Sequence, residues 1–117
     1  MSPGRVIQEV LPEILRGKPL LTESLGAILT IELTGDGGGI WSIDPDGDRV
    51  VISGLNPGAA CLIKMEALYF KELFQTGRIE PWLIAFSQNR ISITGDASIA
   101  LRLGQLLASE LGPGFNL

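Results

Sequence analysis

The hydrophobic period of the chain changes at Glu66, and this change restricts which folds the chain can adopt. Before Glu66, apolar and polar residues alternate in four short runs, at 27–33, 40–44, 50–53 and 60–65. Alternation places successive side chains on opposite faces of a strand, so these runs predict half-buried β-strands. After Glu66, apolar residues recur every three or four positions, which predicts helices. The chain therefore combines a sheet with helices.

Turn-forming segments separate the first three predicted strands. Residues 35–39 read GDGGG and residues 45–48 read PDGD. Short turns of this composition join neighbouring antiparallel strands, so we expect a meander of three strands. The glycine run lacks the Lys and Ser or Thr that follow in a phosphate-binding loop, and it connects two strands instead of opening a helix. We interpret it as a hairpin turn.

The helical periods place a helical segment at each end of the sequence and two between the fourth and fifth strands. Residues 5–16 form an apolar stripe that Pro12 interrupts, so we expect a kink or two short helices that end near Gly17. A helix from 66 to 77, a short helix from about residue 80 and a fifth strand at 91–94 follow. Asp96 is a candidate N-cap for the last helix. The order predicts an α+β fold, with helices on one face of a largely antiparallel or mixed sheet. With no linker or repeat, residues 1–117 are expected to be a single domain.

Charge and hydropathy exclude several classes of protein. The nine basic residues are scattered among thirteen acidic ones, whereas proteins that bind nucleic acid cluster their positive charge. No apolar run reaches the roughly 18 residues of a membrane span, and the first residues lack a signal-peptide pattern. The single cysteine excludes an intrachain disulfide and is compatible with the cytoplasm. We therefore expect a soluble cytoplasmic protein that binds no nucleic acid.

The sequence shows no constellation of catalytic or metal-binding residues. It contains no histidine, which is the usual general base and zinc ligand. Asp44, Asp46 and Asp48 alternate as calcium ligands do, but Arg49 stands where a calcium loop needs glycine, so we expect a turn. Cys61 lies on the apolar face of a predicted strand and is expected to be a buried apolar residue. We predict no enzyme activity, no cofactor and no metal site.

Apolar residues are in excess for so small a chain. Only 19% of residues are charged, against about 25% in ordinary globular proteins. Such an excess fills a large core, a subunit interface or a cavity that holds a lipid, and composition does not choose among them. The candidate residues are large and apolar and lie mostly on the predicted helices: Trp41, Phe70, Phe74, Trp82, Leu83, Phe86, Ile99, Leu103, Leu106 and Leu107. Most are expected to be core residues unless a cavity is present.

Three segments carry a resemblance to a known family. LTIELTGDGGGIWSID, AACLIKMEALYFKELFQTG and RISITGDASIALRLGQLL resemble the sterol carrier protein type 2 family in order and spacing. The third segment is the most specific, and the resemblance covers residues 27–108. It implies a five-stranded sheet covered by helices, around an apolar tunnel for a sterol, fatty acid, fatty acyl-CoA or phospholipid.

The resemblance also implies a function. It implies non-catalytic binding and transfer of lipids, with transient membrane contact, and makes the ten apolar residues above the candidate lipid site. A free-standing form is similar to bacterial members of the family. The alternative is an interaction or scaffold domain that uses its apolar surface for a dimer or a partner. The sequence leaves the lipid and the oligomeric state open.

Overall fold

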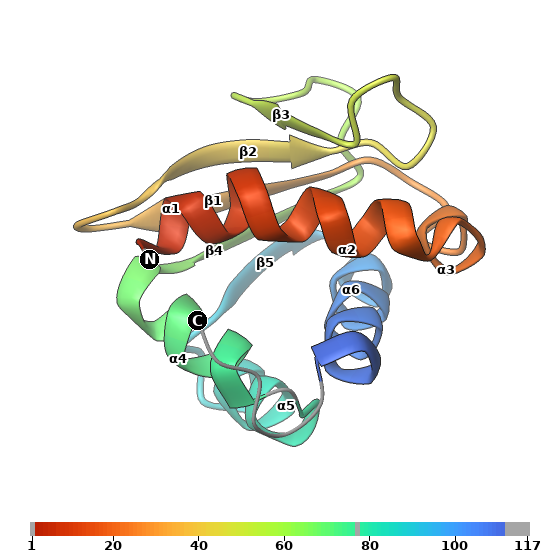
Figure 1. The fold of residues 1–117 in the computed structure, drawn as a ribbon. Coiled ribbons are helices and arrows are strands. Elements are labelled where there is room, and N and C mark those ends of the chain that lie inside the picture. Colours follow the sequence, from red (N-terminus) through yellow and green to blue (C-terminus); the bar gives the residue numbers. More distant parts are fainter. Residues whose placement is uncertain (1, 77, 112–117) are drawn as a thin grey trace.

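The protein is built on one five-stranded sheet, shown in Figure 1 by a computed structural model. The model describes residues 2–76 and 78–111, apart from the side chains of residues 21 and 107–111. The strands lie in the order β3-β2-β1-β4-β5. Their bounds are β1 Leu29–Thr34, β2 Gly39–Ile43, β3 Val51–Ser53, β4 Cys61–Glu66 and β5 Ser92–Gly95. All five predicted strands are confirmed, with bounds that differ by at most two residues.

The sheet is mixed because one of its four pairings is parallel. β1 pairs antiparallel with β2, and β2 with β3, which confirms the predicted meander and both turns. β4 returns beside β1 in the parallel sense, with Ile31 opposite Ile63, and β5 pairs antiparallel with β4. The connection at residues 54–60 makes this return possible. It lies beside Thr30 and Thr94, on the face of the sheet away from the helices.

The helices cover the other face of the sheet (Figure 1). Alternation puts one set of residues on this face, and all of them are buried: Leu29, Ile31, Leu33, Trp41, Ile43, Cys61, Ile63 and Met65. The helices that cover them are α1 Pro3–Arg5, α2 Leu11–Gly17, α3 Pro19–Glu23, α4 Ala67–Thr76, α5 Glu80–Ser87 and α6 Ala97–Leu111. The predicted α+β architecture with helices on one face is therefore confirmed.

The N-terminal helical segment differs from the prediction around Pro12. No break occurs there, because a π-helical turn η1 (Val6–Val10) joins α1 to α2, and the backbone N–H of Leu11 donates to the carbonyl of Val6. Proline lacks an N–H and its ring collides with the carbonyl four residues earlier in an α-helix. The wider π turn just before Pro12 relieves this conflict. The helical segment then ends at Gly17, as predicted.

Close contacts between glycines and Trp41 fix the N-terminal segment over the sheet. The backbone N–H of Gly4 donates to the carbonyl of Gly37 in the β1–β2 turn, at 2.8 Å. A Cβ atom at Gly4 would lie 2.9 Å from that carbonyl oxygen and 3.1 Å from the indole of Trp41. A larger residue at position 4 would therefore push the segment away from the sheet. This contact also explains the deep burial of Trp41.

Candidate functional site

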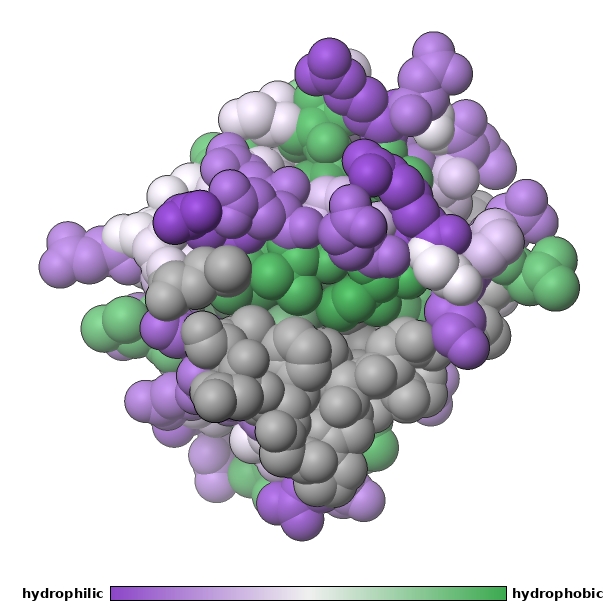
Figure 2. Space-filling view, in the orientation of Figure 1, coloured by the Kyte–Doolittle hydropathy of each residue, from purple (hydrophilic) through white to green (hydrophobic). Residues whose placement is uncertain are grey.

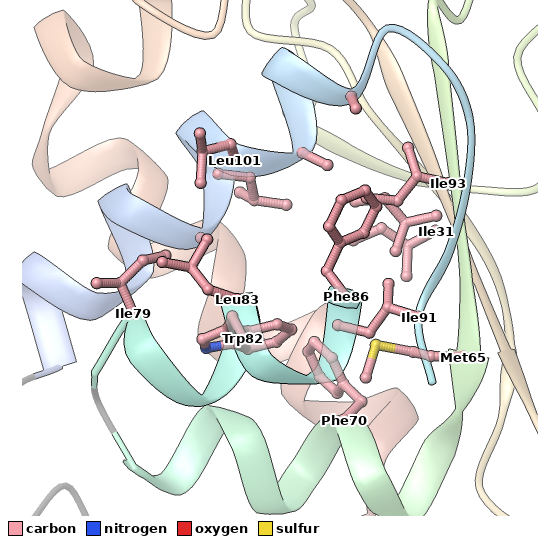
Figure 3. A pocket seen from close by; sticks show the side chains of 15 residues that line it. Ile31, Met65, Phe70, Ile79, Trp82, Leu83, Phe86, Ile91, Ile93 and Leu101 are labelled. Atoms are coloured by element: carbon pink, nitrogen blue, oxygen red, sulfur yellow. The ribbon is translucent and has the colours of Figure 1, made fainter. Parts of the chain in front are cut away.

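An apolar cavity of about 200 Å³ lies between the sheet and the three C-terminal helices. Figure 3 shows its lining side chains converging from the sheet, α5 and α6. The sheet and the segment before β5 contribute Ile31, Ile63, Met65, Ile91 and Ile93. The helices and the connection before α5 contribute Phe70, Ile79, Trp82, Leu83, Phe86, Ala97, Ala100, Leu101, Leu103 and Gly104. The cavity is therefore a space left between the sheet and the C-terminal helices, which pack closely against each other elsewhere.

The lining is almost purely hydrocarbon. None of these fifteen residues carries a carboxylate, amine, hydroxyl or thiol group, and the indole nitrogen of Trp82 is the one side-chain nitrogen among them. A polar group inside such a cavity would lose its hydrogen bonds to water without replacement. The arrangement therefore suits an apolar chain and excludes a buried polar headgroup from the interior.

Aromatic rings form one wall of the cavity. The ring of Phe70 on α4 lies edge-on to the indole of Trp82 on α5, with centroids 6.0 Å apart and an interplanar angle of 69°. The ring of Phe70 also lies near the ring of Phe74 on the same helix, with centroids 5.7 Å apart and planes tilted by 36°. An edge-to-face pair such as Phe70–Trp82 is favourable beyond the apolar area that it buries. This pair holds α5 against α4, and the cavity remains open between α5 and the sheet.

The cavity opens to the surface between α5 and α6. Leu83 and Phe86 on α5 and Leu101 on α6 all line the cavity, yet their side chains remain 45%, 45% and 42% exposed. A side chain that borders both a cavity and solvent marks the edge of an opening. We call these three residues the mouth of the cavity.

The structure separates the ten predicted site residues into three groups. Five line the cavity: Phe70, Trp82, Leu83, Phe86 and Leu103. Four are placed elsewhere: Trp41 packs under α1, and Phe74, Ile99 and Leu106 are buried in the core without lining the cavity. Leu107 belongs to the residues whose side chains are not described. The sequence Gly-Pro-Gly at 112–114, which predicts the end of the last helix, and the short tail that follows at 115–117 also lie outside the described residues.

The geometry of α6 explains this division. Ile99, Leu103 and Leu106 form the buried stripe that the sequence indicates. The cavity faces the neighbouring stripe, which consists of Ala97, Ala100, Leu101 and Gly104, and Leu103 belongs to both. Small residues on that second stripe leave the space open. A Cβ atom at Gly104 would lie only 3.0 Å from the Cδ1 atom of Ile79.

Several lining residues are not among the ten predicted site residues. Ile31, Ile63, Met65 and Ile93 come from three strands, and alternation alone places them on the helix-covered face. Adding that face to the candidate set would have found them. Ala97 and Gly104 carried no such signal, because a small residue in the sequence does not show whether a cavity or a close neighbour lies beside it.

Two titratable groups near the cavity have pKa values that are shifted by their surroundings. Burial raises the pKa of the Cys61 thiol above its ordinary value of 9.0. Ser98 lowers the pKa of Asp96, because its hydroxyl and backbone N–H both donate to the carboxylate, at 2.6 and 3.0 Å. Cys61 is thus the buried, un-ionised residue expected from its position, and Asp96 is the predicted cap of α6.

Two arginines join the cavity-forming helices to the rest of the molecule. The guanidinium of Arg90 lies 3.5 Å from the ring centroid of Tyr69, which links the segment after α5 to α4. Arg102 on α6 donates to the backbone carbonyl of Leu25 at 3.0 Å. The arginine groups hold elements in place and do not line the cavity.

The described residues offer neither a cluster of metal ligands nor a helix that could span a membrane. Within residues 2–76 and 78–111, no three His, Cys, Asp or Glu side chains gather as metal ligands. Among the helices of this described part, none has the length and apolar character of a membrane span. The Asp44, Asp46 and Asp48 segment forms the expected turn, in which the carboxylate of Asp44 accepts from the backbone N–H of Asp46.

Comparisons with solved structures show what the fold resembles. The sterol carrier protein domain 2 of Helicoverpa armigera has a TM-score of 0.68 at 20% identity, covering 87% of this chain and 83% of that chain. The UbiJ-SCP2 ubiquinone synthesis protein has a TM-score of 0.69 at 15% identity, over 89% and 87%. Sterol Carrier Protein-2 from Aedes aegypti, in complex with palmitate, has a TM-score of 0.61 at 16% identity, over 84% and 94%.

Sequence comparison assigns the family directly. No curated protein sequence matches the chain. The model of the SCP-2 sterol transfer family, however, matches residues 7–108, a range that holds every strand and all the cavity-lining residues. The resemblance carried by the three sequence segments is confirmed by this match. The chain belongs to the SCP-2 sterol transfer family.

Proposed function

We propose that this protein binds the hydrocarbon chain of a lipid in the cavity and carries it without chemical change. One observation carries the proposal: an apolar cavity with a mouth to the surface, lined by fifteen residues without a charged side chain. Its relative from Aedes aegypti has been solved with a C16 fatty acid, which makes a long acyl chain the first ligand to test.

The energetics of such a cavity favour a long chain. Each methylene that leaves water contributes about 0.8 kcal/mol, so ten contribute about 8 kcal/mol before the costs of association. Any polar headgroup lies at the mouth, since the interior offers one indole nitrogen as its only polar side-chain atom. We propose a lipid with one long apolar chain as the ligand class.

The absence of chemistry is part of the proposal. The lining residues include no general acid, general base or nucleophile, and the Cys61 thiol is buried with a raised pKa, which disfavours the reactive thiolate. We therefore propose a carrier rather than an enzyme. We also propose that residues 1–117 act as one lipid-binding domain in the cytoplasm.

Native mass spectrometry of the purified protein tests this function. We expect a bound lipid to be retained, and the delipidated protein to take up palmitate at one equivalent. A matched titration with a fluorescent fatty acid should saturate and should be displaced by palmitate. Failure to retain or take up any lipid would contradict the proposal, and release of a chemically altered lipid would contradict its non-catalytic part.

A further inference from the structure

The size of the cavity limits how much of a lipid it can hold. An apolar cavity of about 150 Å³ holds one benzene ring. The cavity here measures about 200 Å³, so it holds about eight carbons in close contact with its walls. Pockets for drug-sized ligands, a class that includes the sterols, measure about 300–1,000 Å³. The cavity therefore has room for a short length of one chain and not for the fused rings of a sterol.

A row of isoleucines closes the end of the cavity at the sheet. Ile31, Ile63 and Ile93 stand side by side on β1, β4 and β5, and all three line the cavity. Ile31 and Ile63 are buried. Figure 3 shows Ile31 and Ile93 on the sheet side of the space, with Leu101 across from them on α6. A chain that enters at the mouth therefore meets this row with its tip.

Trp41 prevents the cavity from extending past Ile31. It continues the row onto β2 and faces the same side of the sheet as Ile31, but it does not line the cavity. Its indole is buried, and a Cβ atom at Gly4 or at Gly39 would lie only 3.1 or 2.7 Å from it. The indole therefore has no room to move away from an incoming chain.

The N-terminal helical segment, which packs on Trp41, is itself fixed in place. On its inner side Val6 and Ile7 are fully buried. On its outer side Arg5 and Glu9 pair at 3.0 Å, and Figure 2 shows hydrophilic side chains gathered over the segment. Moving this segment outward would expose its apolar side to water. The closed end of the cavity therefore stays at Ile31.

The cavity is also confined between α6 and the connection before α5. Gly104 and Ile79 both line it there, and a Cβ atom at Gly104 would lie only 3.0 Å from the Cδ1 atom of Ile79. The two segments thus approach each other about as closely as a glycine permits. A rigid ring system needs width as well as length, whereas an extended chain needs length alone. The shape of the cavity therefore favours the chain.

We propose that the cavity takes up one unbranched chain of about ten carbons, with about eight inside and about two at the mouth, and excludes sterols. Ile31, with Trp41 behind it, sets this length. The inference rests on the proposed carrier function and names the ligand class of that same site. A longer chain such as palmitate binds with its tip at Ile31 and its remaining methylenes outside the mouth, where they add little to the affinity.

A series of saturated fatty acids from hexanoate to palmitate tests the length limit. Each compound displaces a fluorescent fatty acid from the delipidated whole protein. Each methylene that enters the cavity should raise the affinity by up to about fourfold, and this increase should fall below about twofold per methylene beyond decanoate. The fluorescent sterol dehydroergosterol should not bind.

The outcomes of this series separate the length limit from the carrier function. A rise that continues unchanged to palmitate, or uptake of the sterol at one equivalent, would overturn the limit and leave the carrier function standing. Failure of every chain to bind would contradict both.

Ile31→Ala should move the limit to longer chains. The change removes three carbons from the closed end, so dodecanoate should bind about tenfold more tightly than it binds to the wild type. Damage to the fold would lower affinity, so a gain reports on the space itself. Ile31→Val removes one methyl group with little risk to folding and should move the limit by about one carbon. An unchanged limit in Ile31→Val and in a folded Ile31→Ala protein would overturn the role of Ile31.

Leu29→Val is the matched control for Ile31→Val. Leu29 lies on β1, on the same face as Ile31, and it is fully buried but does not line the cavity. The variant should lower the melting temperature and leave the chain-length profile of the wild type. An equal shift of the profile in Leu29→Val would mean that the limit follows stability and not the space at Ile31, which would overturn the proposal.

A brominated chain reports where the tip lies. In Trp82→Phe, Trp41 is the one remaining tryptophan of the sequence. Bromine quenches indole fluorescence at contact, so ω-bromodecanoate should quench Trp41 more strongly than the α-bromo isomer does, and more strongly still when Ile31→Ala is added. Equal or stronger quenching by the α-bromo isomer would place the carboxylate at the closed end and overturn the assignment.

Discussion

Neighbouring residues of α6 serve different purposes although they share one buried stripe. Leu103 is buried and lines the cavity, whereas Ile99, one turn earlier, is equally buried and does not line it. A cavity accepts additional volume, while a close-packed core does not accept it without strain. The two positions therefore make a matched pair for testing whether the cavity holds the ligand.

Leu103→Trp should fill the cavity and displace the lipid. Because the indole enters existing space, we expect the free energy of unfolding to change little while fatty-acid affinity falls about tenfold or more. Fluorescent fatty-acid titration and urea denaturation measure the two quantities.

Ile99→Trp is the comparison for Leu103→Trp. There the same ring overpacks the core, so we expect a loss of about 1–3 kcal/mol of stability. Unchanged lipid affinity in a well-folded Leu103→Trp protein would remove Leu103 from the binding site.

Cys61 should make stability depend on alkaline pH. Burial raises the pKa of its thiol in the folded protein above the ordinary 9.0, so the unfolded chain loses this proton first as the pH rises. The free energy of unfolding should therefore fall above about pH 9. Between about pH 8 and about pH 10, urea denaturation should show a smaller fall in the free energy of unfolding for Cys61→Ala than for the wild type. Equal falls in the two proteins would mean that other groups are responsible.

At the scale of single elements, α5 and α6 form the cavity by opposite means. α6 presents small residues, Ala97, Ala100 and Gly104, that keep the space open. α5 presents large ones that enclose it, and Trp82 and the Arg90–Tyr69 contact tie its two ends to α4. The positions of α5 and α6 therefore set the width of the mouth. A change that moves the start of α6 is expected to alter lipid binding as well as stability.

The cap of α6 should contribute a pH-dependent part of the stability. Ser98 lowers the pKa of Asp96 in the folded protein, so the contribution is present above the ordinary value of 3.8 and is lost as the pH falls through the lowered value. Asp96→Ala should lower the midpoint of urea denaturation at neutral pH, with a smaller difference from the wild type in acid. Asp48→Ala, which removes an exposed carboxylate from a turn, should leave the neutral midpoint unchanged. Equal midpoints for Asp96→Ala and the wild type at neutral pH would contradict the capping role.

At the scale of the whole molecule, the cavity depends on all of the layers together. Its lining comes from three strands, three helices and the connections around α5. A ligand in this space would contact every layer at once, so its binding should stabilise the fold as a whole.

Palmitate should therefore raise the thermal stability of the delipidated protein. With free fatty acid at about 100 times its dissociation constant, binding to the folded state alone adds about 2.7 kcal/mol. Differential scanning calorimetry should show a higher Tm that increases with palmitate concentration, and a smaller increase in Leu103→Trp. A Tm independent of palmitate in the wild type would contradict a site inside the fold.

Much of the architecture follows from local patterns in the sequence. Alternation predicted which residues of β1, β2 and β4 face the helices, because the pleat of a strand permits no other arrangement. The change of period at Glu66 predicted the start of α4, and Asp96 marked the start of α6. Pro12 is the exception. The sequence indicated a conflict there, but packing against the sheet kept the segment helical through a π turn.

The cavity itself was decided by the tertiary structure. Helical period identifies a buried stripe, but the same stripe contains Ile99 in the core and Leu103 at the cavity. Whether a buried residue meets another side chain or empty space depends on how far α5 and α6 stand from the sheet. That distance is set by contacts between segments remote in sequence, such as Phe70 with Trp82 and Arg102 with Leu25. Sequence thus determined which faces are apolar, and the arrangement of the layers determined which of them enclose a site.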